Sequence, residues 1–157
     1  MTYFLPLLLA ALCVAPAGAA WCQTCSVAAT GLAFGSYQPL SGAATNSTAT
    51  ITVTCNPGVI SLLVSYQIQL SAGSGGSFAA RSMGSGGSRL SYQLYSDAAE
   101  TQIWGDGTAG TVTVSDGYTL GLISPIVRTY SCYGNIPAAQ RVGTGSYTDT
   151  ITVLLSY

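Results

Sequence analysis

Residues 146–157 of this chain read SYTDTITVLLSY and form its last segment. Apolar side chains occupy every second position, namely Ile151, Val153, Leu155 and Tyr157, and the positions between them are mostly Thr or Ser. This period of two is typical of a β-strand that turns one face to a hydrophobic core. Such a strand needs a neighbour on each edge, and the printed sequence offers no further strand beyond Tyr157.

The rest of the chain is also rich in short segments with strand character. Each is bounded by Gly, Ser, Asn or Pro, and none shows a sustained helical period of 3.6 residues. Six or seven such strands separated by turns predict an all-β antiparallel sandwich. The segments are 25–37, 48–55, 63–71, 89–96, 111–123, 126–134 and 149–157.

The composition sets limits on the function. Charged residues make up only 6% of the 157 residues, the formal net charge is −1, and the sequence has no His. A chain without a basic patch is a poor ligand for nucleic acid or for anionic membranes. We therefore expect no nucleic-acid partner.

The first twenty residues contain the apolar run FLPLLLAALCVAPAGAA. The run is too short to span a bilayer and ends in small residues, which is typical of a secretory signal peptide. Gly18 and Ala20, or alternatively Ala17 and Ala19, fit the positions before a cleavage site. We expect residues 1–20 to be removed and residues 21–157 to form one exported domain with no membrane span.

Cleavage would leave four cysteines, which in an exported protein indicate two disulfides. Strand alternation turns Cys25 and Cys55 toward the core, so we predict a Cys25–Cys55 bridge, which leaves Cys22 with Cys132. The spacing C-x-x-C is also found in redox proteins, but that chemistry needs a helix after the motif, and no helix is expected here.

Two segments, 71–89 and 105–111, are low in complexity and dense in Gly. We expect flexible loops without tight packing. A second interpretation of the first segment is a mobile contact loop that carries Phe78 and Met83 outward.

The acidic residues do not form a recognisable catalytic or metal-binding motif. They are scattered and mostly lie in turn contexts, and without His or Lys no general base is available to activate a serine. We therefore expect no enzymatic activity, no metal site and no cofactor. The acidic residues are Asp97, Glu100, Asp106, Asp116 and Asp149.

Several phrases occur in the order found in one known family. They are FGSY, a cysteine that ends a Thr/Val strand, LYSDA, WGDG and a terminal strand that begins Y-x-D-T. They occur in register, and the resemblance that they carry extends over nearly all of residues 22–157. The chain resembles the spore coat protein U domain family, the pilin-type domain of archaic (Csu-type) chaperone–usher pili.

This resemblance implies an incomplete immunoglobulin-like antiparallel sandwich that lacks its last strand. A periplasmic chaperone would lend a strand to the empty slot, and after transfer to an outer-membrane usher the donor strand of another pilus subunit would replace it. One groove wall would then be Ile151, Val153, Leu155 and Tyr157, and the facing wall would be Val27, Leu32 and Phe34. The expected locations are the periplasm and then the cell surface.

The chain departs from the family in one respect. After cleavage near Ala20, only WCQT would precede Cys25, which is too short for a donor arm. We expect a subunit that accepts a strand but donates none, which favours a tip or capping position. The apolar stretches 56–64 and 119–127 are either adhesive loops or the buried starts of strands.

Two other functions remain open. The chain could be a self-contained cell-surface binding module, stable as a monomer, or a component of a coat layer. A complete module would unfold cooperatively on its own, whereas an incomplete sandwich would need a chaperone or a donor peptide.

Overall fold

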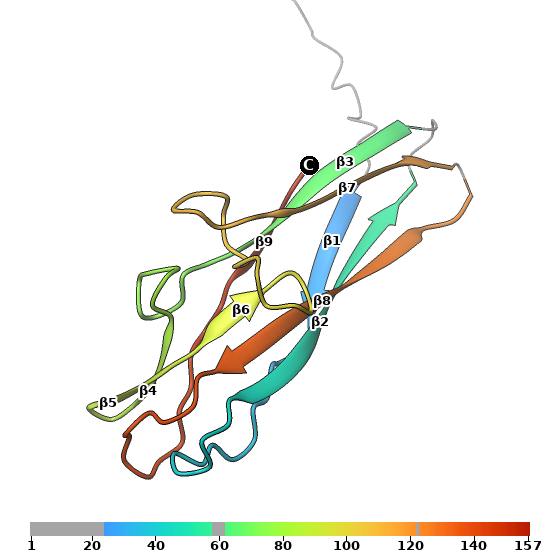
Figure 1. Cartoon of the computed structure of the whole chain (residues 1–157). Helices are drawn as coiled ribbons and strands as arrows, with labels where there is room; N and C mark the ends of the chain where they lie inside the picture. The colour runs from blue at the N-terminus through green and yellow to red at the C-terminus, as the bar shows by residue number, and fades with distance from the viewer. Residues whose placement is uncertain (1–23, 58–61, 122) are drawn as a thin grey trace, which may run out of the picture.

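The computed structural model describes residues 24–57, 62–121 and 123–157, and all regular structure in these ranges is β (Figure 1). Apolar and polar residues alternate most clearly in the two long strands at 45–56 and 62–70. The strands are β1 (Thr24–Ala29), β2 (Thr45–Asn56), β3 (Leu62–Leu70), β4 (Ser82–Ser85), β5 (Ser88–Ser91), β6 (Gln93–Tyr95), β7 (Val114–Leu120), β8 (Ile126–Ile136) and β9 (Val153–Ser156).

Two antiparallel sheets form the sandwich. One has the order β1-β2-β8-β6 and the other β7-β3-β9, and β4 and β5 make a separate hairpin. The first order matches the A-B-E-D sheet of an immunoglobulin domain, and β3 and β9 take the places of strands C and F. The place of strand G, beyond β9, is occupied by no strand of the described residues. The predicted fold class, an incomplete immunoglobulin-like sandwich, is confirmed.

The core lies between the two sheets and follows the alternation that the sequence shows. On β3, Val64, Tyr66, Ile68 and Leu70 are all at most 2% exposed. Trp104 is fully buried and donates its indole N–H to the carbonyl of Ile68, so its polar atom is satisfied inside the core. Other buried apolar residues are Ala49, Ile51, Val53, Cys55, Met83, Leu90, Tyr92, Leu94, Cys132 and Ile136.

The structure confirms one of the two predicted bridges, whereas the other involves a residue outside the described ranges. Cys25 and Cys55 are directly opposed on β1 and β2 and form a disulfide. Cys132 is a buried free thiol in the middle of β8, opposite Ala49. Cys22, the predicted partner of Cys132, lies outside the described residues.

The Gly-rich segments are ordered and packed, contrary to our expectation. Within 71–89, β4 and β5 form a hairpin around Gly86, and Met83 is 9% exposed, so it does not point outward. In 105–111, a Cβ on Gly105 would lie 2.4 Å from Thr111 Oγ1. Glycine here lets the Thr111 side chain pack directly on the backbone, which residue composition alone does not reveal.

Two predicted strands have different limits in the structure. The segment 89–96 divides at Tyr92, because β5 pairs with the β4 hairpin strand whereas β6 pairs with β8. In the terminal segment only Val153–Ser156 is a regular strand. The residues before Val153 form only isolated backbone pairs with their neighbours, including an antiparallel bridge between Thr148 and Gly84.

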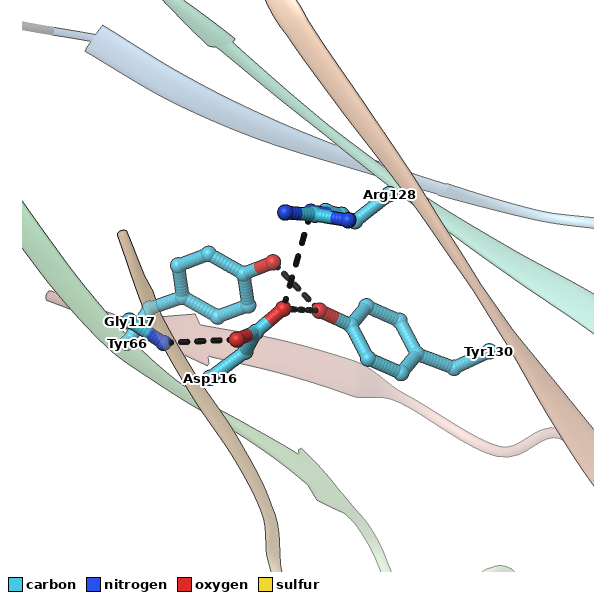
Figure 2. Close-up of polar contacts among 5 residues, drawn as sticks. All are labelled: Tyr66, Asp116, Gly117, Arg128 and Tyr130. Atoms are coloured by element: carbon cyan, nitrogen blue, oxygen red, sulfur yellow. Dashed lines mark hydrogen bonds and ion pairs between the residues drawn. The ribbon is translucent and has the colours of Figure 1, made fainter. Parts of the chain in front are cut away.

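A polar group of side chains joins the two sheets on the side of β7 (Figure 2). Asp116 on β7 accepts a hydrogen bond of 2.7 Å from the Tyr130 hydroxyl on β8, and Tyr130 in turn is bonded to Tyr66 on β3. Arg128 lies 3.9 Å from the same carboxylate. The bond from Tyr130 lowers the pKa of Asp116. This side of the sandwich is therefore closed by side-chain bonds.

Candidate functional site

No strand in the described part of the chain pairs with the outer edge of the terminal segment, residues 146–157. On its inner side, Ser71 N–H donates to the carbonyl of Thr152 at 2.9 Å, and Thr148 exchanges two backbone bonds with Gly84. Even-numbered residues thus bond toward β3 and β4. Because successive residues of a strand turn their main-chain groups to opposite sides, the odd-numbered residues turn theirs outward. The described residues supply no strand partner there.

β1 is the nearest strand to that edge. Some Cα atoms of β1 and β9 lie within 8 Å of each other, and the two strands run side by side in Figure 1. They belong to different sheets, however, and are not paired. The edge of β9 therefore faces β1 without being paired with it.

The facing wall is the segment 29–39, which leaves β1 and continues along β2. Thr30 N–H donates to the carbonyl of Thr50 at 2.9 Å, and the Ser47 hydroxyl donates to the carbonyl of Ala33 at 2.7 Å. The Tyr37 hydroxyl anchors the far end, because it bonds the carbonyl of Pro137 and the N–H of Gln140. Segment 29–39 is thus fixed on sheet β1-β2-β8-β6 without being a regular strand.

Two cavities lie in succession between these walls, and we call them together the groove. The first has a volume of about 470 Å³ and the second about 660 Å³. Both are lined by Leu32, Phe34, Met83 and Tyr147, so they are neighbours along one depression. Buried and half-buried apolar side chains line both cavities, with Gly, Ser and Thr residues between them, and such a lining suits an inserted strand with apolar residues at alternate positions.

The predicted wall residues fall into three groups. Leu32, Phe34, Ile151 and Val153 line the groove. Val27 and Leu155 are half-buried against the core where β1 and β9 approach, outside the two cavities. Tyr157 is 62% exposed and lies beyond the last residue pair of β9 with β3.

Gly134 on β8 lies directly beneath the facing wall, segment 29–39. A Cβ at this position would lie 2.8 Å from Leu32 Cδ1 and 2.8 Å from Phe34 Cζ. These two side chains therefore rest directly on the β8 backbone. Phe34 also meets the ring of Tyr92 edge-on, with centroids 6.1 Å apart.

Asp149 is the half-buried carboxylate of the other wall, the terminal segment 146–157. It accepts hydrogen bonds from the Tyr92 hydroxyl at 2.6 Å and from the N–H groups of Ser74 and Thr150, each at 2.8 Å. Burial opposes ionisation of Asp149, but the bonds from Tyr92 and Ser74 outweigh it and lower the pKa overall. The carboxylate is therefore charged at neutral pH and well bound.

A buried arginine supports the same wall from beneath. Arg81 is fully buried and donates to the carbonyls of Ser71 and Trp104, at 2.9 and 2.7 Å, and to the side-chain oxygen of Gln93 at 2.7 Å. Ser71 in turn is bonded to Thr152, so Arg81 fixes the strand end that holds the terminal segment. Nearby Cys132 lines the first cavity, and burial raises the pKa of its thiol to about 11.

Sequence reasoning missed several groove residues. Asp149 begins the predicted strand 149–157 and shares the inward parity of Ile151 and Val153, and this parity could have identified it as a groove residue. Met83 and Tyr147 reach the groove only through the hairpin and the loop 137–147, which no local pattern indicates. Asp97 and Asp106 do lie in turns and bond their neighbours Thr101 and Thr108.

The two apolar stretches that were candidates for adhesion lie at the same end of the sandwich, because Leu62 pairs with Leu120 and Cys55 with Ile126. Leu63 is 79% and Ile123 92% exposed, whereas Val64 is buried. Residues 58–61 and 122 lie outside the described ranges.

In the part of the chain that the structure describes, no three His, Cys, Asp or Glu side chains gather as metal ligands would. No helix in these ranges has the length and apolarity needed to cross a membrane.

Comparison with known proteins gives two positive results. Curated proteins yielded no match by sequence. Among solved structures, the chain is similar to one chain of the chaperone–tip adhesion subunit pre-assembly complex from archaic chaperone–usher Csu pili of Acinetobacter baumannii. The TM-score is 0.55 at 20% identity, over 87% of this chain and 40% of that one, so the likeness concerns the fold. The family model described as the Spore Coat Protein U domain matches residues 9–154, and the chain therefore belongs to the spore coat protein U domain family.

Proposed function

We propose that this protein is an exported structural subunit of an adhesive chaperone–usher pilus, and that the groove accepts a donor strand. The observation that carries the proposal is the unpaired edge of the terminal segment beside an apolar groove. A β-strand inserted there would bond the outward main-chain groups of β9 and place alternate side chains in the cavities. Family membership and the fold of the Csu complex support the same function.

The partners follow from this arrangement. An exposed apolar groove with an open edge is prone to aggregation, so a periplasmic chaperone would cover it first. An outer-membrane usher and the donor strand of another subunit would then complete the domain on the cell surface. Export through the periplasm is part of the proposal, and so is the removal of residues 1–20.

Co-expression with a candidate periplasmic chaperone tests the proposal, with co-purification as the measurement. Val153→Ser removes an apolar side chain from the groove, whereas Leu154→Ser changes the neighbouring residue, which is 53% exposed on the outer face. We expect Val153→Ser to reduce capture at least about tenfold and Leu154→Ser to leave it near the wild-type level. Equal capture by both variants would contradict the groove assignment.

The same experiment separates the alternatives. A chain that is soluble, monomeric and cooperative in unfolding without any chaperone would favour a self-contained binding module or a coat-layer component. The tip or capping position stays a prediction, and its test is whether the mature N-terminal segment complements another subunit.

A further inference from the structure

Among the described groove-lining residues, Tyr92 is the one whose side chain bonds one wall and packs its ring against the other. Its hydroxyl donates to Asp149 on the terminal segment, and its ring packs edge-on against Phe34 on segment 29–39. Tyr92 itself is 6% exposed and is held by its backbone N–H, which donates to the carbonyl of Arg81. The contacts Asp149–Tyr92–Phe34 thus cross the groove beneath the path of an inserted strand.

We infer that Tyr92 and Asp149 are positioning residues that hold the terminal segment at a fixed distance from the facing wall while the groove is unfilled. This inference rests on the proposed function, because it concerns the acceptor groove before a strand arrives. The acceptor in the pair is a carboxylate, and hydrogen bonds to charged groups are the stronger kind.

A fixed position of the terminal segment would help an incoming strand to pair with it. The outer main-chain groups of residues 149–155 have no strand partner among the described residues, so this wall has bonds on one side only. Strands held on one side open more readily than central strands. The bond from Tyr92 to Asp149 ties the N-terminal part of this wall to the other side of the groove, and it thereby keeps the edge aligned for pairing with an incoming strand.

A matched pair of substitutions isolates this effect. Tyr92→Phe removes the hydroxyl that crosses the groove. Tyr147→Phe also removes one tyrosine hydroxyl from the groove lining, but that hydroxyl bonds the carbonyl of Gly143 within its own loop, at 2.8 Å. The two variants therefore differ in whether the lost bond connects the walls.

The labelling rate of the Cys132 thiol measures how often the terminal segment opens, because this thiol is buried and lines the first cavity. The exported chain would carry Cys22→Ser in every variant, and N-ethylmaleimide labelling of Cys132 would be followed by mass spectrometry. We expect Tyr92→Phe to label about tenfold faster than the parent and Tyr147→Phe to stay within about twofold. Asp149→Ala removes the acceptor of the Tyr92 hydroxyl and should label like Tyr92→Phe.

Labelling in 0 to about 1 M urea separates wall opening from global unfolding. Local opening exposes little surface and depends weakly on urea, whereas global unfolding depends on it steeply. The inference is overturned if Tyr92→Phe labels no faster than Tyr147→Phe, or if its labelling follows the steep dependence. No chaperone or donor is present, so failure here leaves the capture experiment with Val153→Ser unaffected.

Discussion

Substitution of Gly134 tests the facing wall of the groove, segment 29–39, through a residue that lines neither cavity. In Gly134→Ala, the new Cβ would lie 2.8 Å from both Leu32 Cδ1 and Phe34 Cζ. Ordinary contacts between carbon atoms are about 3.5–4.0 Å, so both side chains must retreat by about 0.7–1.2 Å. The open direction is into the groove that they line.

The expected cost to the unfilled subunit is small. Overpacking typically destabilises by about 1–3 kcal/mol, and replacing Gly by Ala within a strand returns about 0.5–1 kcal/mol. We therefore expect the free energy of unfolding, measured by urea titration, to fall by about 0.5–2 kcal/mol. A subunit that stays folded can then be tested for capture.

Capture should suffer more than stability. An inserted strand fills the space into which Leu32 and Phe34 have moved, so the strain of about 1–3 kcal/mol reappears and weakens binding by roughly 5- to 150-fold. The apparent Kd for the chaperone, measured with the purified subunit, checks this value. Gly84→Ala is the control, because its Cβ would lie 3.6 Å from the Arg89 guanidinium, an ordinary contact. Wild-type affinity in a destabilised Gly134→Ala subunit would refute the assignment of these residues to the groove wall.

Three further predictions concern stability. Arg81→Met should lower the free energy of unfolding by about 3–5 kcal/mol in urea titration, because it leaves the buried acceptors of Arg81 unsatisfied; a loss under 1 kcal/mol would contradict the role given to this residue. Replacing Cys25 and Cys55 by Ala opens a loop with a sequence separation of 30 and should cost about 3–4 kcal/mol in the same assay, and an unchanged midpoint would count against it. The lowered pKa of Asp149 means that its contribution is complete above the ordinary aspartate value of about 3.9 and is lost as the pH falls through the lower folded value. Acid titration of stability should accordingly be less steep for Asp149→Asn than for the parent, and identical curves would argue against this account.

Local pattern alone was sufficient for much of this protein. The alternation on β2, β3 and the terminal segment predicted which side chains are buried, because a strand has a period of two and one face of each sheet meets the core. The same alternation paired Cys25 with Cys55, which sit opposite each other on adjacent strands. The order of motifs such as FGSY and WGDG indicated the family, and with it the missing strand.

The tertiary structure decided what lies between the sheets. Cys132 is a buried thiol opposite Ala49 on β2, a position set by strand register, which the sequence does not state. Gly-rich residues 71–89 pack closely because Arg81 finds its acceptors on three separate segments. The groove itself, with Tyr92 between Asp149 and Phe34, joins residues more than 50 positions apart. Contacts of this kind depend on the packing of two sheets, and local periodicity cannot determine them because it records only the face on which each side chain lies.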